Sequence, residues 1–140
     1  MTEKSTTKIL VFGGNGFIGG ETVVELLAMN TFDITVVNRG HWDDFDAKIR
    51  IKPFVKTITI DRYDESNRKM RREWKLFRKS SNAQGKLRSS IGDEHFDAVI
   101  DFSAYDSDVV KDTLDVLENR IKLYVYISTD SVYEVEFCLF

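Results

Sequence analysis

The sequence predicts an α/β fold in which a doubly wound parallel sheet of about five strands carries helices on both faces. Three features predict it: short runs rich in β-branched and aromatic residues, helical segments between them, and a glycine-rich turn directly after the first run. Because crossovers between parallel strands are right-handed, the strand order 3-2-1-4-5 is favoured. With 140 residues and 42% hydrophobic content, the chain is expected to form a single domain over 1–140.

The first part of the chain predicts two strands around one helix. Residues 8–12 read KILVF, an apolar run that fits a strand buried on both faces. GGNGFIGG follows and leads into a helix through about residue 28, in which Val23, Leu26 and Leu27 share an apolar face. FDITVVNRG then predicts a second strand that ends in a loop.

The second part of the chain predicts three further strands. Residues 41–52 are polar without convincing periodicity and are expected to form a loop before Pro53 and the third strand, FVKTITI. Residues 62–95 are expected to be a basic, partly helical insert. A fourth strand, FDAVIDF, precedes a helix capped by Asp106 or Ser107, and KLYVYIS is the fifth strand. The apolar face of that helix is expected to comprise Val110, Leu114 and Leu117.

The glycine turn predicts a dinucleotide-binding site. Three glycines with GxxGxxG spacing follow the first strand and enter the first helix, where they allow a tight turn, close approach of a diphosphate and close helix–strand packing. The helix N-terminus offers unpaired amides to the phosphates. No GK[ST] follows, which disfavours a mononucleotide phosphate loop, although a glycine-rich turn without a ligand is the alternative. The residues expected to bind the cofactor here are Gly13, Asn15, Gly16, Phe17, Ile18 and Gly19.

The end of the second strand favours NADP over NAD. An NAD site places an acid about 20 residues beyond the glycines, but this chain has Asn38 there, followed by Arg39. A neutral amide does not repel a 2′-phosphate, and a guanidinium can pair with it. The alternative for Arg39 is a solvated loop arginine.

These segments together resemble the short-chain dehydrogenase/reductase superfamily, in its extended or atypical epimerase/dehydratase/reductase branch. FGGNGFIG, VVNRG, IDR, FDAVIDFSAY and YVYISTDSVY occur in the expected order. The resemblance implies a Rossmann fold and a parent enzyme that reduces, epimerises or dehydrates a small carbonyl compound or nucleotide-sugar. It places Asp61 and Arg62 beside the adenine ring, and Phe102, Ser103 and Ala104 along the cofactor crevice. It is also compatible with a homodimer.

The catalytic set that the resemblance implies is incomplete. Thr129 takes the position of the family's catalytic Ser or Thr, whose hydroxyl would stabilise charge on a substrate oxygen; a structural role at the strand end is the alternative. The family's YxxxK pair is absent, because no tyrosine of the chain has a lysine four positions later. We therefore expect a fragment truncated after strand five, inactive alone.

The basic insert suggests a second function. Residues 62–92 contain ten Lys or Arg and three acids, and Met70, Trp74 and Phe77 fall at helical spacing among the cations. A solvated crossover helix explains this pattern. The alternative is a non-catalytic protein that senses a dinucleotide or binds RNA through residues 68–79.

The remaining features suggest little further chemistry. A net charge of −3, one cysteine, no signal peptide and no long apolar run predict a cytoplasmic chain without a membrane span. His41 and His95 are expected in loops, with no metal site. Asp93, Glu94, Asp97 and Asp101 are expected to form a solvated cluster.

Overall fold

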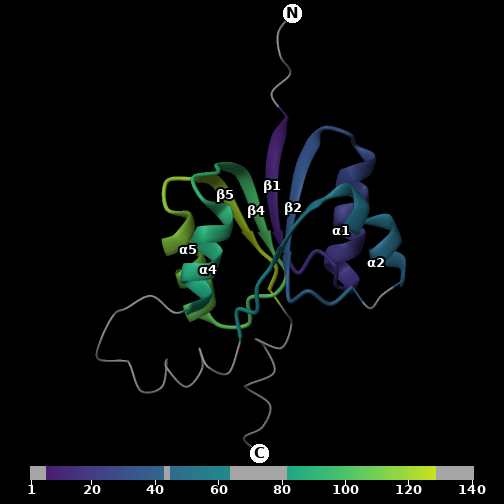
Figure 1. The fold of residues 1–140 in the computed structure, drawn as a ribbon. Helices are drawn as coiled ribbons and strands as arrows, with labels where there is room; N and C mark the ends of the chain where they lie inside the picture. Colours follow the sequence, from purple (N-terminus) through teal and green to yellow (C-terminus); the bar gives the residue numbers. More distant parts are fainter. Residues whose placement is uncertain (1–5, 43–44, 64–81, 129–140) are drawn as a thin grey trace, which may run out of the picture.

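The computed structural model describes residues 6–42, 45–63 and 82–128. Its sheet is parallel and five-stranded, with the order β3-β2-β1-β4-β5 that the sequence predicts (Figure 1). The strands are β1 (Thr7–Phe12), β2 (Phe32–Asn38), β3 (Lys56–Thr59), β4 (Phe96–Asp101) and β5 (Ile121–Tyr126).

Helices cover both faces of the sheet, as expected for a doubly wound fold. Helices α1 (Phe17–Ala28) and α2 (Phe45–Arg50) lie on one face, and α4 (Asn82–Ile91) and α5 (Ser107–Leu117) lie on the other (Figure 1). The central strand serves both cores, since Ile9 and Val11 face α1 while Leu10 and Phe12 face α5. This confirms that the first strand is buried on both faces.

The segment after β2 corrects the sequence-based prediction. Residues 41–52, expected as a loop, contain α2, and a 3-10 turn (Lys52–Phe54) takes the beginning of the expected third strand. Trp42, Ala47 and Ile51 are buried against the α1 side of the sheet. Because α2 has only six residues, it buries too few side chains to produce a repeating pattern in the sequence.

The apolar face of α5 agrees with the prediction only in part, because Leu117 is fully buried and Val110 is partly buried, but Leu114 is not. Leu114 is 40% exposed, and the buried residues of the helix are Val109, Thr113, Val116 and Leu117. The predicted start is confirmed, because Asp106 is the N-cap and its Oδ1 accepts a hydrogen bond from the Val109 amide at 2.9 Å. In α1, Val23 is fully buried and Leu26 and Leu27 are partly buried.

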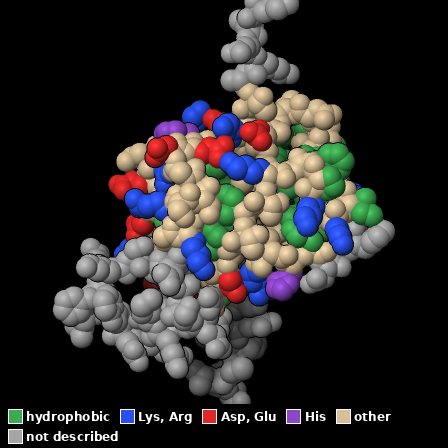
Figure 2. All heavy atoms as spheres, viewed as in Figure 1, with side chains coloured by type: hydrophobic (Ala, Val, Ile, Leu, Met, Phe, Trp, Pro, Cys, Tyr) green, Lys and Arg blue, Asp and Glu red, His purple; other side chains and the backbone are tan. Residues whose placement is uncertain are grey.

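Ion pairs connect the amino ends of the strands. Glu94 binds Lys8 at 3.1 Å and Lys56 at 2.8 Å, and Asp97 binds Lys122 at 2.6 Å. Figure 2 shows acidic and basic side chains interspersed on the upper part of the visible face. Hydrogen bonds from Lys56 lower the pKa of Glu94 against the opposing effect of burial, with Lys8 contributing further.

Strand β5 forms one edge of the sheet. Leu123 is 55% exposed there. An open edge is compatible with association, and a homodimer stays a prediction. Within the described part of the chain, no helix combines the length and apolar character needed to cross a membrane.

Candidate functional site

The glycine turn between β1 and α1 has the geometry expected for a tight turn. Gly13 has a φ of +74°, a conformation that side-chain-bearing residues rarely adopt. Its amide donates to the Val37 carbonyl at 2.9 Å, and its carbonyl accepts from the Gly16 amide at 3.0 Å. The chain therefore turns sharply at the end of the central strand and starts the helix four residues later.

Gly19 supplies the close packing that the sequence predicts. A Cβ at this position would lie 2.3 Å from the Gly13 carbonyl oxygen, a backbone atom that cannot swing aside like a side chain. At Gly16 the equivalent distance is 3.3 Å, and this residue is exposed. The two glycines thus differ in degree: a Cβ at Gly19 would clash with the turn, whereas one at Gly16 would make a tight contact with the same carbonyl oxygen.

The N-terminus of α1 is arranged for an anion. Its N-cap is Gly16, which provides no side-chain cap, and the first turn contains no acid. The amides of the first helical turn therefore have no carboxylate competing for them, and the helix dipole favours negative charge there.

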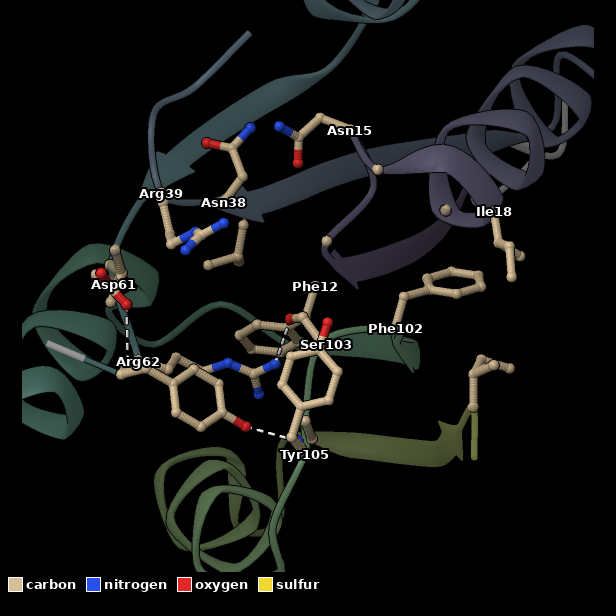
Figure 3. Close-up of a pocket in the computed structure, with 18 of the residues that line it drawn as sticks. Phe12, Asn15, Ile18, Asn38, Arg39, Asp61, Arg62, Phe102, Ser103 and Tyr105 are labelled. Carbon is tan, nitrogen blue, oxygen red and sulfur yellow. Dashed lines mark hydrogen bonds between the residues drawn. The ribbon is translucent and has the colours of Figure 1, made fainter. Parts of the chain in front are cut away.

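A cavity of about 690 Å³ lies at the carboxyl edge of the sheet, a volume within the roughly 300–1,000 Å³ typical of ligand pockets. All of the residues predicted to bind the cofactor line it, although their role in binding stays a prediction: Gly13, Asn15, Gly16, Phe17, Ile18, Gly19, Asn38, Arg39, Asp61, Arg62, Phe102, Ser103 and Ala104. Figure 3 shows Asn15, Asn38, Arg39 and Asp61 toward one end and Ile18 and Phe102 toward the other.

Asn38 presents an unsatisfied donor at the polar end of the cavity. The residue is only 6% exposed, and its Oδ1 accepts a hydrogen bond from the Gly40 amide at 2.8 Å. That bond fixes the orientation of the side-chain amide, because only an oxygen can accept from a backbone N–H. The buried Nδ2 has no hydrogen-bond partner among the described residues. A buried donor of this kind is costly unless an acceptor meets it.

Three further polar side chains lie toward the same end of the cavity as Asn38 (Figure 3). Arg39 is exposed at the cavity wall, so its guanidinium can reach a ligand. Asp61 lies toward the same end of the cavity (Figure 3), and its Oδ1 accepts a hydrogen bond from the Tyr63 amide at 2.8 Å. Asn15 donates a side-chain hydrogen bond to the His41 carbonyl, which joins the glycine turn to the loop after β2.

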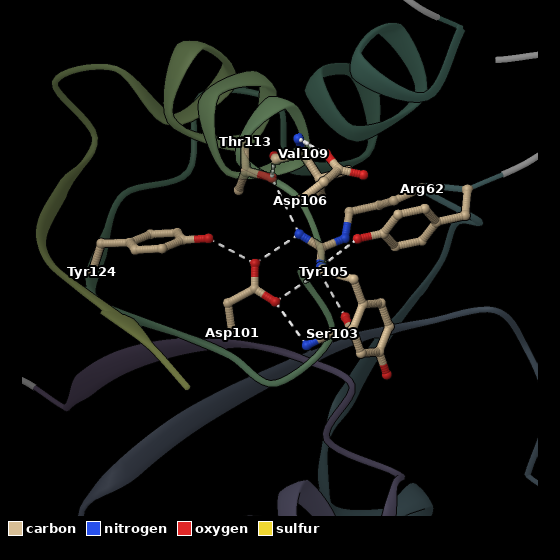
Figure 4. Close-up of polar contacts among 9 residues, drawn as sticks. Arg62, Asp101, Ser103, Tyr105, Asp106, Val109, Thr113 and Tyr124 are labelled. Atoms are coloured by element: carbon tan, nitrogen blue, oxygen red, sulfur yellow. Dashed lines mark hydrogen bonds and ion pairs between the residues drawn. The ribbon is translucent and has the colours of Figure 1, made fainter. Parts of the chain in front are cut away.

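A buried ion pair lies beside the cavity, which Arg62 lines and Asp101 does not. The Arg62 guanidinium makes two 2.7 Å hydrogen bonds to the Asp101 carboxylate (Figure 4). It also lies 4.2 Å from the centre of the Phe12 ring. The side chains of Arg62 and Asp101 are 9% and 0% exposed. The prediction that Asp101 belongs to a solvated acidic cluster is therefore wrong, because its side chain is fully buried and paired with Arg62.

Additional hydrogen bonds hold this pair in place. Arg62 also donates to the Ser103 hydroxyl at 2.6 Å and to the Thr113 hydroxyl at 3.2 Å. Asp101 accepts from the Tyr124 hydroxyl at 2.6 Å and from the Ser103 amide at 2.9 Å. Residues from β4, β5, α5 and the segment after β3 thus meet at one buried point.

The electrostatics of this cluster keep the acid ionised. Burial acts to raise the pKa of Asp101, but the hydrogen bonds and charge of Arg62, with those of Tyr124 and Ser103, outweigh it and lower the pKa overall. Burial, followed by the hydrogen bond to Asp101, raises the pKa of Tyr124. Tyr124 therefore remains a neutral donor beside an ionised carboxylate.

The cavity also contains residues that the sequence analysis did not assign to it. Tyr63 and Tyr105 pair at its rim, with ring centres 5.8 Å apart and the Tyr105 amide donating to the Tyr63 hydroxyl at 2.6 Å. Burial raises the pKa of Tyr63. All of the unassigned residues flank the carboxyl ends of β1, β2, β3, β4 or β5, a position that would have identified them: Phe12, Val37, His41, Ile60, Tyr63, Tyr105, Tyr126, Ile127 and Ser128.

Two predicted features lie outside the described residues. They are Thr129, the candidate catalytic residue, and the basic segment 68–79. Within the described ranges, no group of three or more histidine, cysteine or acidic side chains could hold a metal ion.

Comparison with known proteins shows which fold this arrangement belongs to. No protein-family model and no curated protein matches the chain. Among solved structures, a short-chain dehydrogenase/reductase from Veillonella parvula matches with a TM-score of 0.63 at 15% identity, covering 91% of this chain and 50% of that one. The chain has the fold of these enzymes.

Two other solved structures match over a similar part of the chain. A dTDP-glucose 4,6-dehydratase from Bacillus anthracis in complex with NAD has a TM-score of 0.60 at 21% identity, with 91% and 39% of the two chains covered. A wide-type short-chain dehydrogenase/reductase from Veillonella parvula in complex with NADP has a TM-score of 0.58 at 17% identity, with 91% and 50% covered. The chain spans about half or less of the length of each of these three structures.

Proposed function

We propose that this chain is the dinucleotide-binding portion of an epimerase, dehydratase or reductase of the short-chain dehydrogenase/reductase type, and that it prefers NADP to NAD. The fold, the tight glycine turn and the uncapped helix N-terminus support binding of a dinucleotide diphosphate. The nicotinamide would supply hydride chemistry to a small carbonyl or nucleotide-sugar substrate of the whole enzyme. This chain has no YxxxK pair to provide the acid–base step.

The observation that carries the cofactor preference is the unpartnered Nδ2 of Asn38. An NAD site needs an acceptor at the end of this strand for the ribose 2′-hydroxyl. Here the amide oxygen already accepts a hydrogen bond from Gly40, and the group left without a partner among the described residues is the donor Nδ2. A 2′-phosphate accepts hydrogen bonds, and the neighbouring Arg39 can neutralise its charge. Asn15 lies across from Asn38 in the same part of the cavity (Figure 3).

Replacing Asn38 with aspartate is expected to reverse the preference. The carboxylate keeps the acceptor for Gly40, turns its second oxygen toward the ribose 2′-hydroxyl, and repels a 2′-phosphate. We expect the dissociation constant for NADPH to rise by about 30-fold, on the order of one charge-assisted hydrogen bond, while NADH binds more tightly. Parallel calorimetric titrations with the two cofactors measure the ratio.

A matched control separates the local effect from the added charge. Asn119→Asp introduces the same charge in the turn before β5, outside the cavity, and is expected to leave the ratio unchanged. Wild-type protein that binds neither cofactor would overturn the proposed function. Equal binding of NADPH and NADH would overturn only the preference.

The RNA-binding alternative rests on residues 68–79, outside the described part of the chain, and stays a prediction.

A further inference from the structure

Ser103 lies where the glycine turn meets the loop after β4. A Cβ at Gly13 would be 3.2 Å from the Ser103 Cβ and 3.5 Å from its Oγ. Both residues line the cavity. The Ser103 hydroxyl is therefore next to the turn whose amides face the proposed diphosphate.

The hydrogen bonds of Ser103 leave one group unused. Its amide donates to Asp101, and its Oγ accepts from Arg62 at 2.6 Å (Figure 4). A hydroxyl has one proton to donate besides its acceptor capacity. Among the described residues, none accepts a hydrogen bond from the Ser103 hydroxyl. Because a guanidinium already binds the oxygen, the O–H is polarised and becomes a stronger donor.

The strand order tells which part of a dinucleotide this donor would meet. Asn38 and Arg39 follow β2, the glycine turn follows β1, and Ser103 follows β4. A ligand whose adenosine 2′-position lies at β2 and whose diphosphate lies at the turn after β1 must continue toward β4. Its nicotinamide mononucleotide half then passes over Ser103.

We propose that Ser103 is a specificity-determining residue that donates a hydrogen bond from Oγ to an oxygen of the nicotinamide mononucleotide half of the dinucleotide, and that Arg62 is the positioning residue that orients this donor. The inference rests on the proposed function, and it adds a contact that distinguishes a dinucleotide from an adenosine phosphate. Since Asp101 offsets the charge of Arg62, the cluster supplies a directed donor and no net charge.

The test compares two ligands that share the adenosine half. Full-chain protein is titrated with NADPH and with 2′,5′-ADP, which lacks the nicotinamide mononucleotide half. In Ser103→Ala we expect the dissociation constant for NADPH to rise about tenfold, while that for 2′,5′-ADP stays unchanged, which also shows that the variant is folded. Ser103→Thr keeps the hydroxyl and is expected to bind NADPH within about threefold of wild type.

Control variants test whether the loss of affinity comes from the Ser103 hydroxyl. Ser89→Ala removes a hydroxyl that bonds within α4, and is expected to change neither affinity. Raising the ionic strength should weaken the contribution of the exposed Arg39, measured with Arg39→Ala, but leave the Ser103→Ala effect intact, because screening acts on exposed charges. An Arg62→Lys variant should lose at least as much NADPH affinity as Ser103→Ala does, since an ammonium does not reproduce the fixed geometry of the guanidinium.

The outcomes of these titrations distinguish the Ser103 contact from the proposed function. An equal loss for both ligands, or no loss for either, would overturn the Ser103 contact while leaving the proposed function in place. If the wild-type protein bound neither NADPH nor 2′,5′-ADP, both proposals would be overturned.

Discussion

Replacing Gly19 with alanine is expected to abolish measurable NADPH binding at micromolar concentrations. The added Cβ would lie 2.3 Å from the Gly13 carbonyl oxygen, so either α1 or the turn must move. Gly13 occupies a left-handed conformation held by a hydrogen bond to Val37, and its shift would misplace the amides that face the cavity. We expect the dissociation constant to rise by at least about 100-fold and the free energy of unfolding to fall by about 1–3 kcal/mol.

Gly20 offers a matched control for this substitution. It is the next residue of the same helix and is also buried, but a Cβ there would make an ordinary 3.5 Å contact with Ile51 Cδ1. Because alanine favours the helix over glycine, Gly20→Ala should be as stable as wild type or more so, with unchanged binding. Calorimetry and urea unfolding measure the two quantities. Wild-type affinity in Gly19→Ala would contradict the role assigned to this glycine.

The sequence predicts the position of the cavity because its lining follows the ends of strands. Each of the short apolar runs has a length and composition typical of buried parallel strands, and in such a sheet the carboxyl ends lie along one edge. Locating Gly13, Asn38, Asp61 and Ser103 at those ends therefore brings them together without any knowledge of side-chain contacts. The order β3-β2-β1-β4-β5 confirms that reasoning.

The partners of those residues could not be predicted in the same way. Arg62 and Asp101 are 39 positions apart, and local patterns contain no information about contacts at that separation. Arg62 also belonged to a segment whose many charges suggested a solvated surface. One signal was available: Asp101 directly follows the apolar run AVI at the end of β4, and a buried carboxylate requires a cation or donors nearby.

Removing the arginine of this pair is expected to destabilise the fold strongly. In Arg62→Met, Asp101 stays fully buried without its cation, so the free energy of unfolding at pH 7 should fall by about 3–5 kcal/mol. Arg50→Met is the matched control, because Arg50 pairs with Asp46 at 2.7 Å but both side chains are largely exposed. Exposed pairs contribute little, and we expect near-wild-type unfolding in urea for that variant.

A second substitution identifies the buried charge as the cause. The variant Arg62→Met/Asp101→Asn replaces the carboxylate with a neutral amide that can still accept from the Ser103 amide. We expect it to recover at least half of the stability that Arg62→Met loses. If the double variant were no more stable than the single one, lost packing of Arg62 against Phe12 would be the larger effect instead.

Acid should act in opposite directions on the wild-type protein and on Arg62→Met. In the wild type, the pKa of Asp101 is lower in the folded than in the unfolded state, so its contribution to stability is present above about pH 4, the range of an unperturbed aspartate, and is lost as the pH falls through the folded-state pKa. In Arg62→Met, burial without the cation raises that pKa, and the folded state takes up a proton more readily than the unfolded chain. The stability difference between the two proteins should therefore shrink as the pH is lowered from 7 toward 4. Urea unfolding at several pH values, followed by far-ultraviolet circular dichroism, measures this difference, and a constant gap would show that the loss comes from packing rather than from the stranded charge.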